Sequence, residues 1–176
     1  GVVVLAACAG LWAWKQRATR AHALVTSPAP EQPSLLQRAA YYANIGQRDN
    51  NERAVELFEQ ALKEQPGNVE AQVGLSRAYS ARVCLFNFPP VWAVRAQALA
   101  EQGIRAQPAR AAAHAALGYS HDCRGRIGDA LAGYERALAL DPTADSSRAS
   151  AAYLYDRKGL LAQALVANTS LRGDPS

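Results

Sequence analysis

The spacing of three prolines, Pro66, Pro108 and Pro142, restricts the fold of this chain more than any other feature. The interval from Pro108 to Pro142 is about 34 residues, and self-similarity with a period of roughly 20–50 residues is typical of repeat proteins. The interval from Pro66 to Pro108 is longer, and it fits the same period with an insertion of eight residues. The chain is therefore predicted to be an array of similar units.

The same pattern of small and aromatic residues stands before each proline. In the clearest copy, Ala130, Tyr134 and Ala137 lie 12, 8 and 5 positions before the proline. These offsets recur before Pro66, and they recur with small residues throughout before Pro108. Spacings of three and four place side chains on one face of a helix. Each proline is therefore expected to follow a helix whose packed face carries small residues.

A second pattern precedes each of these helices, and its clearest copy is Leu117-Gly118, His121 and Gly125. The combined order resembles the tetratricopeptide repeat (TPR) family, in which each repeat is a helix-turn-helix unit of about 34 residues. The resemblance implies an all-α fold, an α-solenoid of about four repeats at residues 34–66, 69–108, 111–142 and 145–174. The expected helices are 34–46, 51–65, 69–87, 90–107, 110–124, 127–140, 144–158 and 160–172.

The N-terminal segment is apolar and is followed by basic residues. Residues 1–14 carry no charged side chain, and Lys15, Arg17 and Arg20 come next. A transmembrane helix needs about 20 apolar residues, and the chain begins without Met, so we expect upstream residues to complete a span. We assign 1–25 to a transmembrane helix with a basic extension and 26–33 to a proline-rich linker. The expected membrane-contacting residues are Val2, Val3, Val4, Leu5, Leu11, Trp12 and Trp14.

Other interpretations of this segment stay open. The four residues 5–8 are similar to a lipoprotein cleavage box, a secretory signal peptide fits the same stretch, and a buried soluble helix is a third possibility. Positive residues beside a span tend to remain in the cytoplasm. The favoured location is therefore the bacterial inner membrane with a single span and the array in the cytoplasm, and the alternative places the array in the periplasm.

Three adjacent residues, His121, Asp122 and Cys123, have side chains of the types that catalytic clusters use. On the repeat register they lie in one helix, where neighbouring side chains point about 100° apart and cannot converge on one atom. A zinc site requires three or four ligands, and only His114 lies on a similar face. We therefore expect a packed histidine, no catalytic residue, no metal, no cofactor, and a protein that is not an enzyme.

The insertion of eight residues falls within the hydrophobic stretch 81–95. It predicts a longer first helix, a turn at residues 87–89, and a second helix that starts at Pro90, where proline is tolerated. Phe86, Phe88 and Trp92 either cap the solenoid core locally or form a protruding corner that binds a partner.

Two cysteines fall late in the first helices of neighbouring repeats. First helices of adjacent TPR units pack side by side, so Cys84 and Cys123 are expected to lie near each other. They can pair in an oxidising compartment, or remain small buried residues in the cytoplasm. We favour free thiols.

The resemblance to TPR proteins implies a binding surface on the inner face formed by the first helices. The register assigns Ser80 to this face, together with the expected partner-binding residues Arg77, Tyr119, Asp122, Tyr153, Asp156 and Arg157. The Lys/Asn/Arg set with which some family members bind a C-terminal carboxylate is not matched. Tyr119 and Tyr153 are the expected anchors for a partner segment.

The order of span, basic flank, linker and repeats resembles the inner-membrane TPR subunits of exopolysaccharide-export machines. We therefore expect a non-catalytic scaffold tethered to the bacterial inner membrane, with protein partners in such a complex. The alternatives are the sensor part of a membrane-bound winged-helix transcription regulator and an accessory domain of an envelope enzyme. Nucleic acid is not an expected ligand: the net charge is +4, but the basic flank supplies most of it, and the remainder is nearly neutral.

Overall fold

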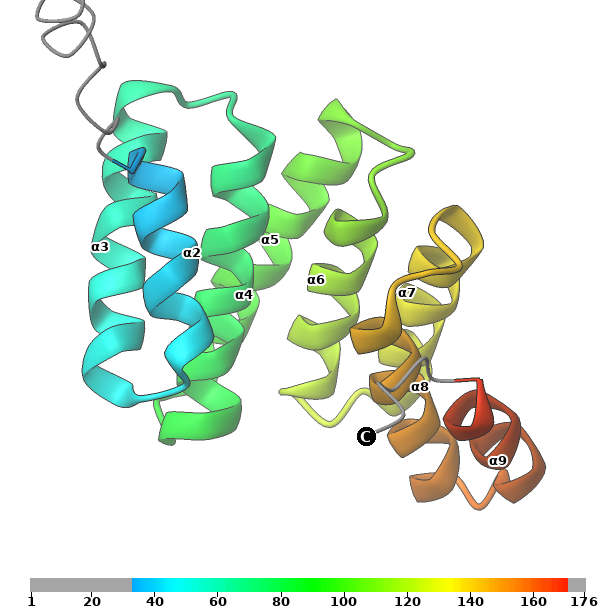
Figure 1. Cartoon of the computed structure of the whole chain (residues 1–176). Helices are drawn as coiled ribbons and strands as arrows, with labels where there is room; N and C mark the ends of the chain where they lie inside the picture. Colours follow the sequence, from blue (N-terminus) through cyan, green and yellow to red (C-terminus); the bar gives the residue numbers. More distant parts are fainter. Residues whose placement is uncertain (1–32, 171–176) are drawn as a thin grey trace, which may run out of the picture. The chain divides into compact units, whose positions relative to one another are not determined.

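The structure, a computed structural model, describes residues 33–170, which belong to one compact unit, Pro33–Ser176. These described residues form eight α-helices and no strand. Successive helices pair as hairpins that stack one beside the next (Figure 1). In chain order the helices are α2 (Leu35–Ile45), α3 (Arg48–Glu64), α4 (Val69–Phe86), α5 (Val91–Ala106), α6 (Ala111–Asp122), α7 (Ile127–Leu140), α8 (Asp145–Arg157) and α9 (Leu161–Thr169).

The predicted all-α solenoid is confirmed for the described residues, and the helix ends lie within three residues of those expected. The start of α3 shows one of the largest differences, since this helix begins at Arg48 and the expected start was residue 51. Gly46 ends α2 in the left-handed conformation with φ 73°, and the chain re-enters a helix two residues later. Residues 48–50 therefore extend α3 at its N-terminus and do not lengthen the loop.

Local chemistry explains several of the helix ends. The Ser34 hydroxyl accepts a hydrogen bond from the backbone N–H of Gln37, whose side chain accepts one from the Ser34 N–H, which is a capping box. The turns that follow α6 and α8 contain Gly125 and Gly159 with φ of 71° and 73°. Glycine adopts this conformation without the steric cost that a Cβ would add. These caps set where each hairpin reverses.

The apolar core is divided into three clusters along the array. The first lies among α2, α3, α4 and α5 around Phe58 and Leu75. The second joins α4, α5 and α6 through Val73 and Ala116, and the third joins α7 and α8 around Tyr134 and other buried side chains. Neighbouring hairpins thus bury their apolar faces against each other, as a solenoid requires.

The insertion lengthens α4, as predicted. This helix has 18 residues and ends at Phe86, and the capping residue Asn87 adopts a left-handed conformation with φ 57°. The N–H of Phe88 donates to the carbonyl of Arg82 at 3.0 Å, and α5 begins at Val91, directly after Pro90. The inserted residues therefore form additional helical turns and a tight corner.

A disulfide joins Cys84, near the end of α4, to Cys123, the residue after α6. We favoured free thiols, and that interpretation was wrong. The expectation that the two residues lie close together is confirmed, because their Cα atoms are 5.1 Å apart, within the range that a disulfide spans. The length of α4 brings Cys84 level with the end of the shorter α6.

The predicted location at the bacterial inner membrane has to be corrected. Among the helices of residues 33–170, none is both long enough and apolar enough to cross a bilayer. The prediction depended on residues 1–25 and on the proposed membrane-contacting side chains Val2, Val3, Val4, Leu5, Leu11, Trp12 and Trp14, all of which lie outside the described residues.

Candidate partner-binding groove

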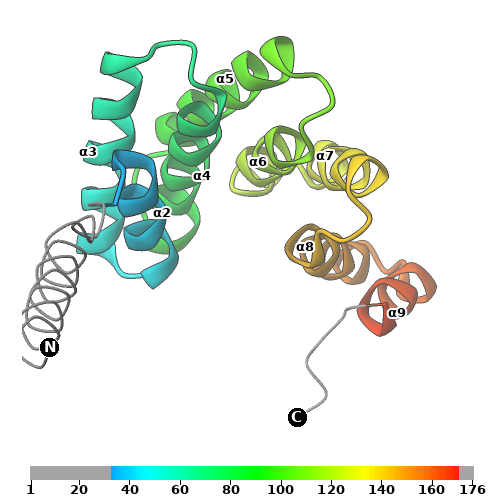
Figure 2. The same ribbon diagram turned by 45° about the horizontal axis from the view of Figure 1, so that its top comes forward.

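The first helices of the hairpins, α2, α4, α6 and α8, follow the inner side of the curved array (Figure 2). Residues of all four helices line a groove. Asn51 and Phe58 of α3 and Tyr134 of α7 also line it, and its volume is about 520 Å³. We call this surface the concave groove. A cavity of this size accommodates several side chains of a bound segment.

The lining of the concave groove is chemically mixed along its length. On the α2 side, Leu36 and Ala40 lie beside Asn44. On the α6 and α8 side, Ala112 lies beside polar residues such as Ser146. The groove therefore offers both apolar contacts and hydrogen-bonding groups to a bound segment.

The floor of the groove depends on Gly74 in α4. A Cβ added to Gly74 would lie 2.4 Å from the Phe58 ring, closer than real atoms approach. The ring therefore lies directly against the backbone of α4. A larger residue at position 74 would occupy the space that the Phe58 ring now fills at the floor of the groove.

Five of the predicted partner-binding residues interact in one row across three helices. Arg77 extends from α4, Tyr119 and Asp122 belong to α6, and Tyr153 and Arg157 belong to α8. The guanidinium of Arg157 lies 5.7 Å from the centre of the Tyr153 ring. Only Arg77 and Tyr119 of this row line the cavity itself. Tyr153 is 57% exposed and lies one helical turn after Ser150, which does line the cavity. The structure thus connects residues far apart in sequence into one polar and aromatic strip, which we call the tyrosine row.

Charges within the tyrosine row influence one another. Burial raises the pKa of the Tyr119 phenol, the negative charge of Asp122 raises it further, and the positive charge of Arg77 lowers it. Burial also raises the pKa of the Asp122 carboxyl, while Arg157 lowers it. No ion pair binds Arg77 to a carboxylate in the described part of the chain. Among residues 33–170, Arg77 is therefore an exposed cation that lines the groove without an ion-pair partner.

The structure places two residues, Asp156 and Ser80, outside the groove to which the repeat register had assigned them. Asp156 is exposed on α8 but does not line the cavity. Ser80, which the register placed on the inner face, is fully buried between helices.

Sequence reasoning also missed Leu85, which lines the groove and is 61% exposed. Its spacing of eight residues from Arg77 is a helical spacing that could have identified it.

The corner after α4 holds its aromatic rings between arginines. The Phe88 ring lies 4.6 Å from the guanidinium of Arg48 and 5.3 Å from that of Arg82. Trp92 lies 4.3 Å from Arg82 and 4.7 Å from Arg95, and it packs against the first core cluster. Phe86, Phe88 and Trp92 are all partly buried. This arrangement fits local capping of the core better than a protruding aromatic patch.

The adjacent residues His121, Asp122 and Cys123 do not converge on one atom. His121 is 7% exposed, and its buried Nδ1 has no hydrogen-bond partner. The sulfur of Cys123 is bonded to Cys84 and is not a free thiol. No group of three or more side chains suited to a metal ion occurs within residues 33–170. The histidine is thus a packed residue of the α6–α7 hairpin.

Comparison with known proteins agrees with this architecture. The family model for the tetratricopeptide repeat matches residues 47–82, which comprise most of α3 and α4. No curated protein matches the chain. The described residues therefore form an all-α TPR-like solenoid, and solenoids of this class bind other proteins on their concave surface.

Solved structures share the fold. TTC0263, a thermophilic TPR protein of Thermus thermophilus, is 24% identical with a TM-score of 0.69 and is matched over 78% of this chain and 70% of its own. MamA from Desulfovibrio magneticus RS-1 is 23% identical with a TM-score of 0.57, over 78% and 71% of the two chains. MamA from MSR-1 is 23% identical with a TM-score of 0.53, over 77% and 71%. At these identities the likeness concerns the fold alone.

Proposed function

We propose that this chain is a non-catalytic scaffold that holds a segment of a partner protein in the concave groove. The observation that supports this most directly is the tyrosine row, in which Arg77 and Tyr119 line the cavity and Tyr153 is an exposed side chain on α8. Tyrosine and arginine are the residue types that most often dominate the binding energy of protein interfaces. The guanidinium of Arg77 favours a segment with a hydrogen-bond acceptor or an acidic group opposite it.

The wider roles expected from the sequence stay predictions. A part in an exopolysaccharide-export machine depends on partners that the groove itself does not identify. The sensor part of a winged-helix transcription regulator would require a DNA-binding domain in the same polypeptide. An accessory role for an enzyme would require co-purification with that enzyme. Each of these roles uses the same groove and differs only in what occupies it.

The test begins with the full-length chain as bait. Peptides are selected against it from a displayed random library, and the affinity of the best peptide is measured by fluorescence anisotropy. Arg77 and Tyr153 are both exposed, and we expect Arg77→Glu and Tyr153→Ala each to weaken peptide binding at least tenfold. We expect the double substitution Tyr119→Ala with Tyr153→Ala to abolish binding. Tyr41→Ala serves as the matched control, because Tyr41 is exposed on α2 and does not line the groove.

Equal affinity in wild type and in the folded Arg77→Glu and Tyr153→Ala variants would contradict the proposal. In that event, the corner with Phe86, Phe88 and Trp92 becomes the next surface to test. Far-UV circular dichroism of each variant establishes that the helices are intact. The same variants then serve in pull-down from mild detergent, with identification of the co-purifying proteins.

A further inference from the structure

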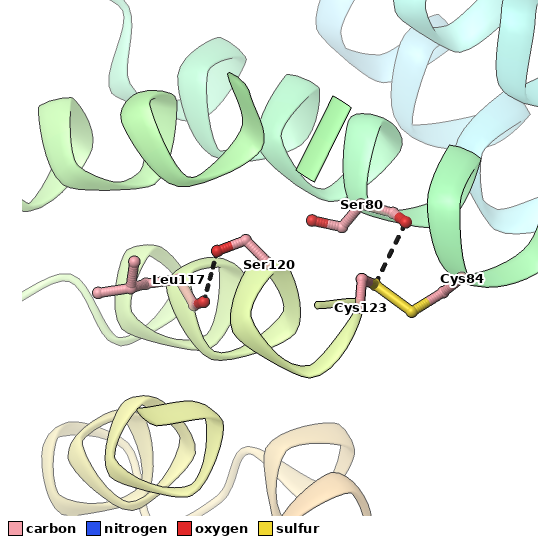
Figure 3. The surroundings of a disulfide bond; sticks show 5 residues. All are labelled: Ser80, Cys84, Leu117, Ser120 and Cys123. Carbon is pink, nitrogen blue, oxygen red and sulfur yellow. Dashed lines mark hydrogen bonds between the residues drawn. A yellow bond between two sulfur atoms is a disulfide. The ribbon is translucent and has the colours of Figure 1, made fainter. Parts of the chain in front are cut away.

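The disulfide lies at the junction between two hairpins of the array. Cys84 belongs to the α4–α5 hairpin and Cys123 to the α6–α7 hairpin, so the bond crosses from one repeat to the next (Figure 3). The sulfur of Cys123 also lies 3.3 Å from the carbonyl oxygen of Ser80. The bond therefore links the C-terminal ends of two neighbouring first helices.

The two ends of this junction are held by different forces. Toward the N-terminal halves of α4 and α6, the second core cluster packs apolar side chains, among them Val69, Val73 and Ala113. Burial of such surface is the main attraction between elements of a fold. This end of the junction is therefore held without any covalent bond.

Small polar residues occupy the opposite end. Ser80 and Ser120 are fully buried on the facing sides of the two helices, beside the disulfide (Figure 3). The Ser120 hydroxyl donates to the carbonyl of Leu117 in its own helix, and the Ser80 hydroxyl has no partner. Neither serine therefore makes a side-chain hydrogen bond across the junction. The buried members of the second core cluster extend no further than Val73 in α4 and Ala116 in α6, so this end of the junction lies beyond them.

The same junction forms the middle of the concave groove. Arg77 and Leu85 line it from α4, and Tyr119 lines it from α6. Leu85 directly follows Cys84, and Asp122 of the tyrosine row directly precedes Cys123. The separation of the two helix ends thus sets the distance across the groove between its α4 side and its α6 side.

We propose that the Cys84–Cys123 disulfide is a redox-controlled brace that sets the width of the concave groove. When the bond is reduced, the ends of α4 and α6 separate while the second core cluster acts as a hinge, and the groove widens. Cys84 is exposed, so an external thiol can attack the bond. The binding consequence rests on the function proposed above, whereas the opening of the junction does not.

The chemistry of the switch is thiol–disulfide exchange with a dithiol reductant. One thiolate of the reductant attacks a sulfur of the bond and releases the other cysteine as a thiolate, and its second thiol then resolves the mixed disulfide. Cys84 and Cys123 together gain two electrons and two protons, and the dithiol becomes a cyclic disulfide. The brace is therefore closed in an oxidising compartment and open in a reducing one.

The first test measures the junction directly. The full-length chain with Cys8→Ser, which removes the third cysteine, is compared in its oxidised form and after treatment with dithiothreitol. Amide hydrogen exchange is followed by mass spectrometry. We expect exchange at residues 80–86 and 118–122 to become at least tenfold faster on reduction, while residues 69–75 and 111–116 keep their protection. The Cys84→Ser/Cys123→Ser variant should match the reduced protein and should not respond to dithiothreitol.

A second readout measures binding. The library-selected peptide should bind the oxidised chain at least tenfold more tightly than the reduced chain, and this difference should vanish in the double-serine variant. Far-UV circular dichroism checks that helix content is retained after reduction, which keeps the comparison valid even where the double-serine variant folds poorly.

The outcomes separate the two proposals. Unchanged exchange at residues 80–86 and 118–122, or a uniform rise that includes residues 69–75 and 111–116, overturns the brace. Localised opening with no effect of the redox state on peptide affinity overturns its control of the groove. Localised opening in a protein that binds no peptide in either state supports the brace and refutes the proposed function.

Discussion

Two glycines allow α6 and α7 to come closer together than any larger residues would permit. A Cβ added to Gly133 would lie 2.7 Å from the Cα of Gly118, and one added to Gly118 would lie 2.9 Å from the carbonyl oxygen of Ala130. The obstacle at both positions is backbone, which cannot move aside as a flexible side chain can. The repeat pattern predicted Gly118 and Ala130 as packing positions, but it gave no weight to Gly133.

Substitution at Gly133 tests this contact. We expect Gly133→Ala to lower the free energy of unfolding by roughly 1–3 kcal/mol, because the methyl group overpacks a helix crossing. Gly128→Ala is the matched control in the same helix: no atom lies within 4 Å of an added Cβ there, and alanine favours helix by about 1 kcal/mol. Urea unfolding followed by circular dichroism gives both values. Equal effects of the two substitutions would show that the crossing tolerates a methyl group.

His121 makes the stability of the array depend on pH. Burial lowers the pKa of this histidine below its ordinary 6.5, and the nearby positive charges of Arg126 and Arg124 lower it further. The negative charges of Asp129 and Glu101 raise the pKa and offset part of this effect. The unfolded chain therefore binds a proton at a higher pH than the folded chain does. Stability falls as the pH decreases from near 6.5 toward the lower pKa of the folded protein.

The corresponding measurement is urea unfolding at about pH 7 and about pH 5. We expect His121→Gln to lose less stability between these two conditions than the wild type, because glutamine does not titrate. The same pH dependence in His121→Gln and in the wild type would assign the effect to other groups.

At the scale of helices, the repeat period of the sequence predicted most helix ends. It could do so because the interactions that begin and end a helix involve residues close together in the sequence. Spacings of three and four identify a helix, and proline or glycine limits it. The corner after α4 was only partly predictable. Its longer helix follows from the insertion, whereas the stacking of Phe88 between Arg48 and Arg82 joins side chains from α3 and α4 that no local spacing relates.

Arg82 is the centre of this corner, and its replacement tests the role of the stack. Its guanidinium lies over the rings of Tyr79, Phe88 and Trp92 at 5.7, 5.3 and 4.3 Å. We expect Arg82→Met to destabilise the array by about 1–2 kcal/mol, because partly buried cation–π contacts have energies of that order. Arg95→Met, which removes a single contact with Trp92, should cost less. The urea unfolding midpoints of the two variants measure this difference. An equal loss of stability in both variants would contradict a central role for Arg82.

At the scale of the whole array, the described residues 33–170 contain three core clusters and one disulfide, and stability is distributed among them. Each cluster joins adjacent hairpins, so the array has few contacts between distant repeats. The disulfide connects residues separated by 39 positions, and it restricts the unfolded chain as well as the junction. Its contribution should therefore appear both in the global stability and in the local opening described above.

Reduction of the disulfide should lower the free energy of unfolding by roughly 2–4 kcal/mol. The check is urea unfolding of the Cys8→Ser chain with and without dithiothreitol, with the Cys84→Ser/Cys123→Ser variant as an insensitive control. An unchanged unfolding midpoint would mean that the bond adds nothing to the stability of the array.

The amino-acid sequence alone determined the helical repeats, their approximate ends, and the small residues that face neighbouring helices. These features depend on interactions within a few residues along the chain, which a periodic pattern records. It also selected Arg77, Tyr119, Asp122, Tyr153 and Arg157, but only as members of separate helices. Their use as a binding surface remains to be tested.

Only the tertiary structure decided which residues meet across repeats. The pairing of Cys84 with Cys123, the burial of Ser80 and the alignment of Arg77 with Tyr119 all depend on the angle and offset between hairpins. Side-chain packing over many residues sets that angle, and a one-dimensional pattern does not contain it. The sequence therefore predicts the units of the solenoid, and long-range packing decides how those units together form a groove.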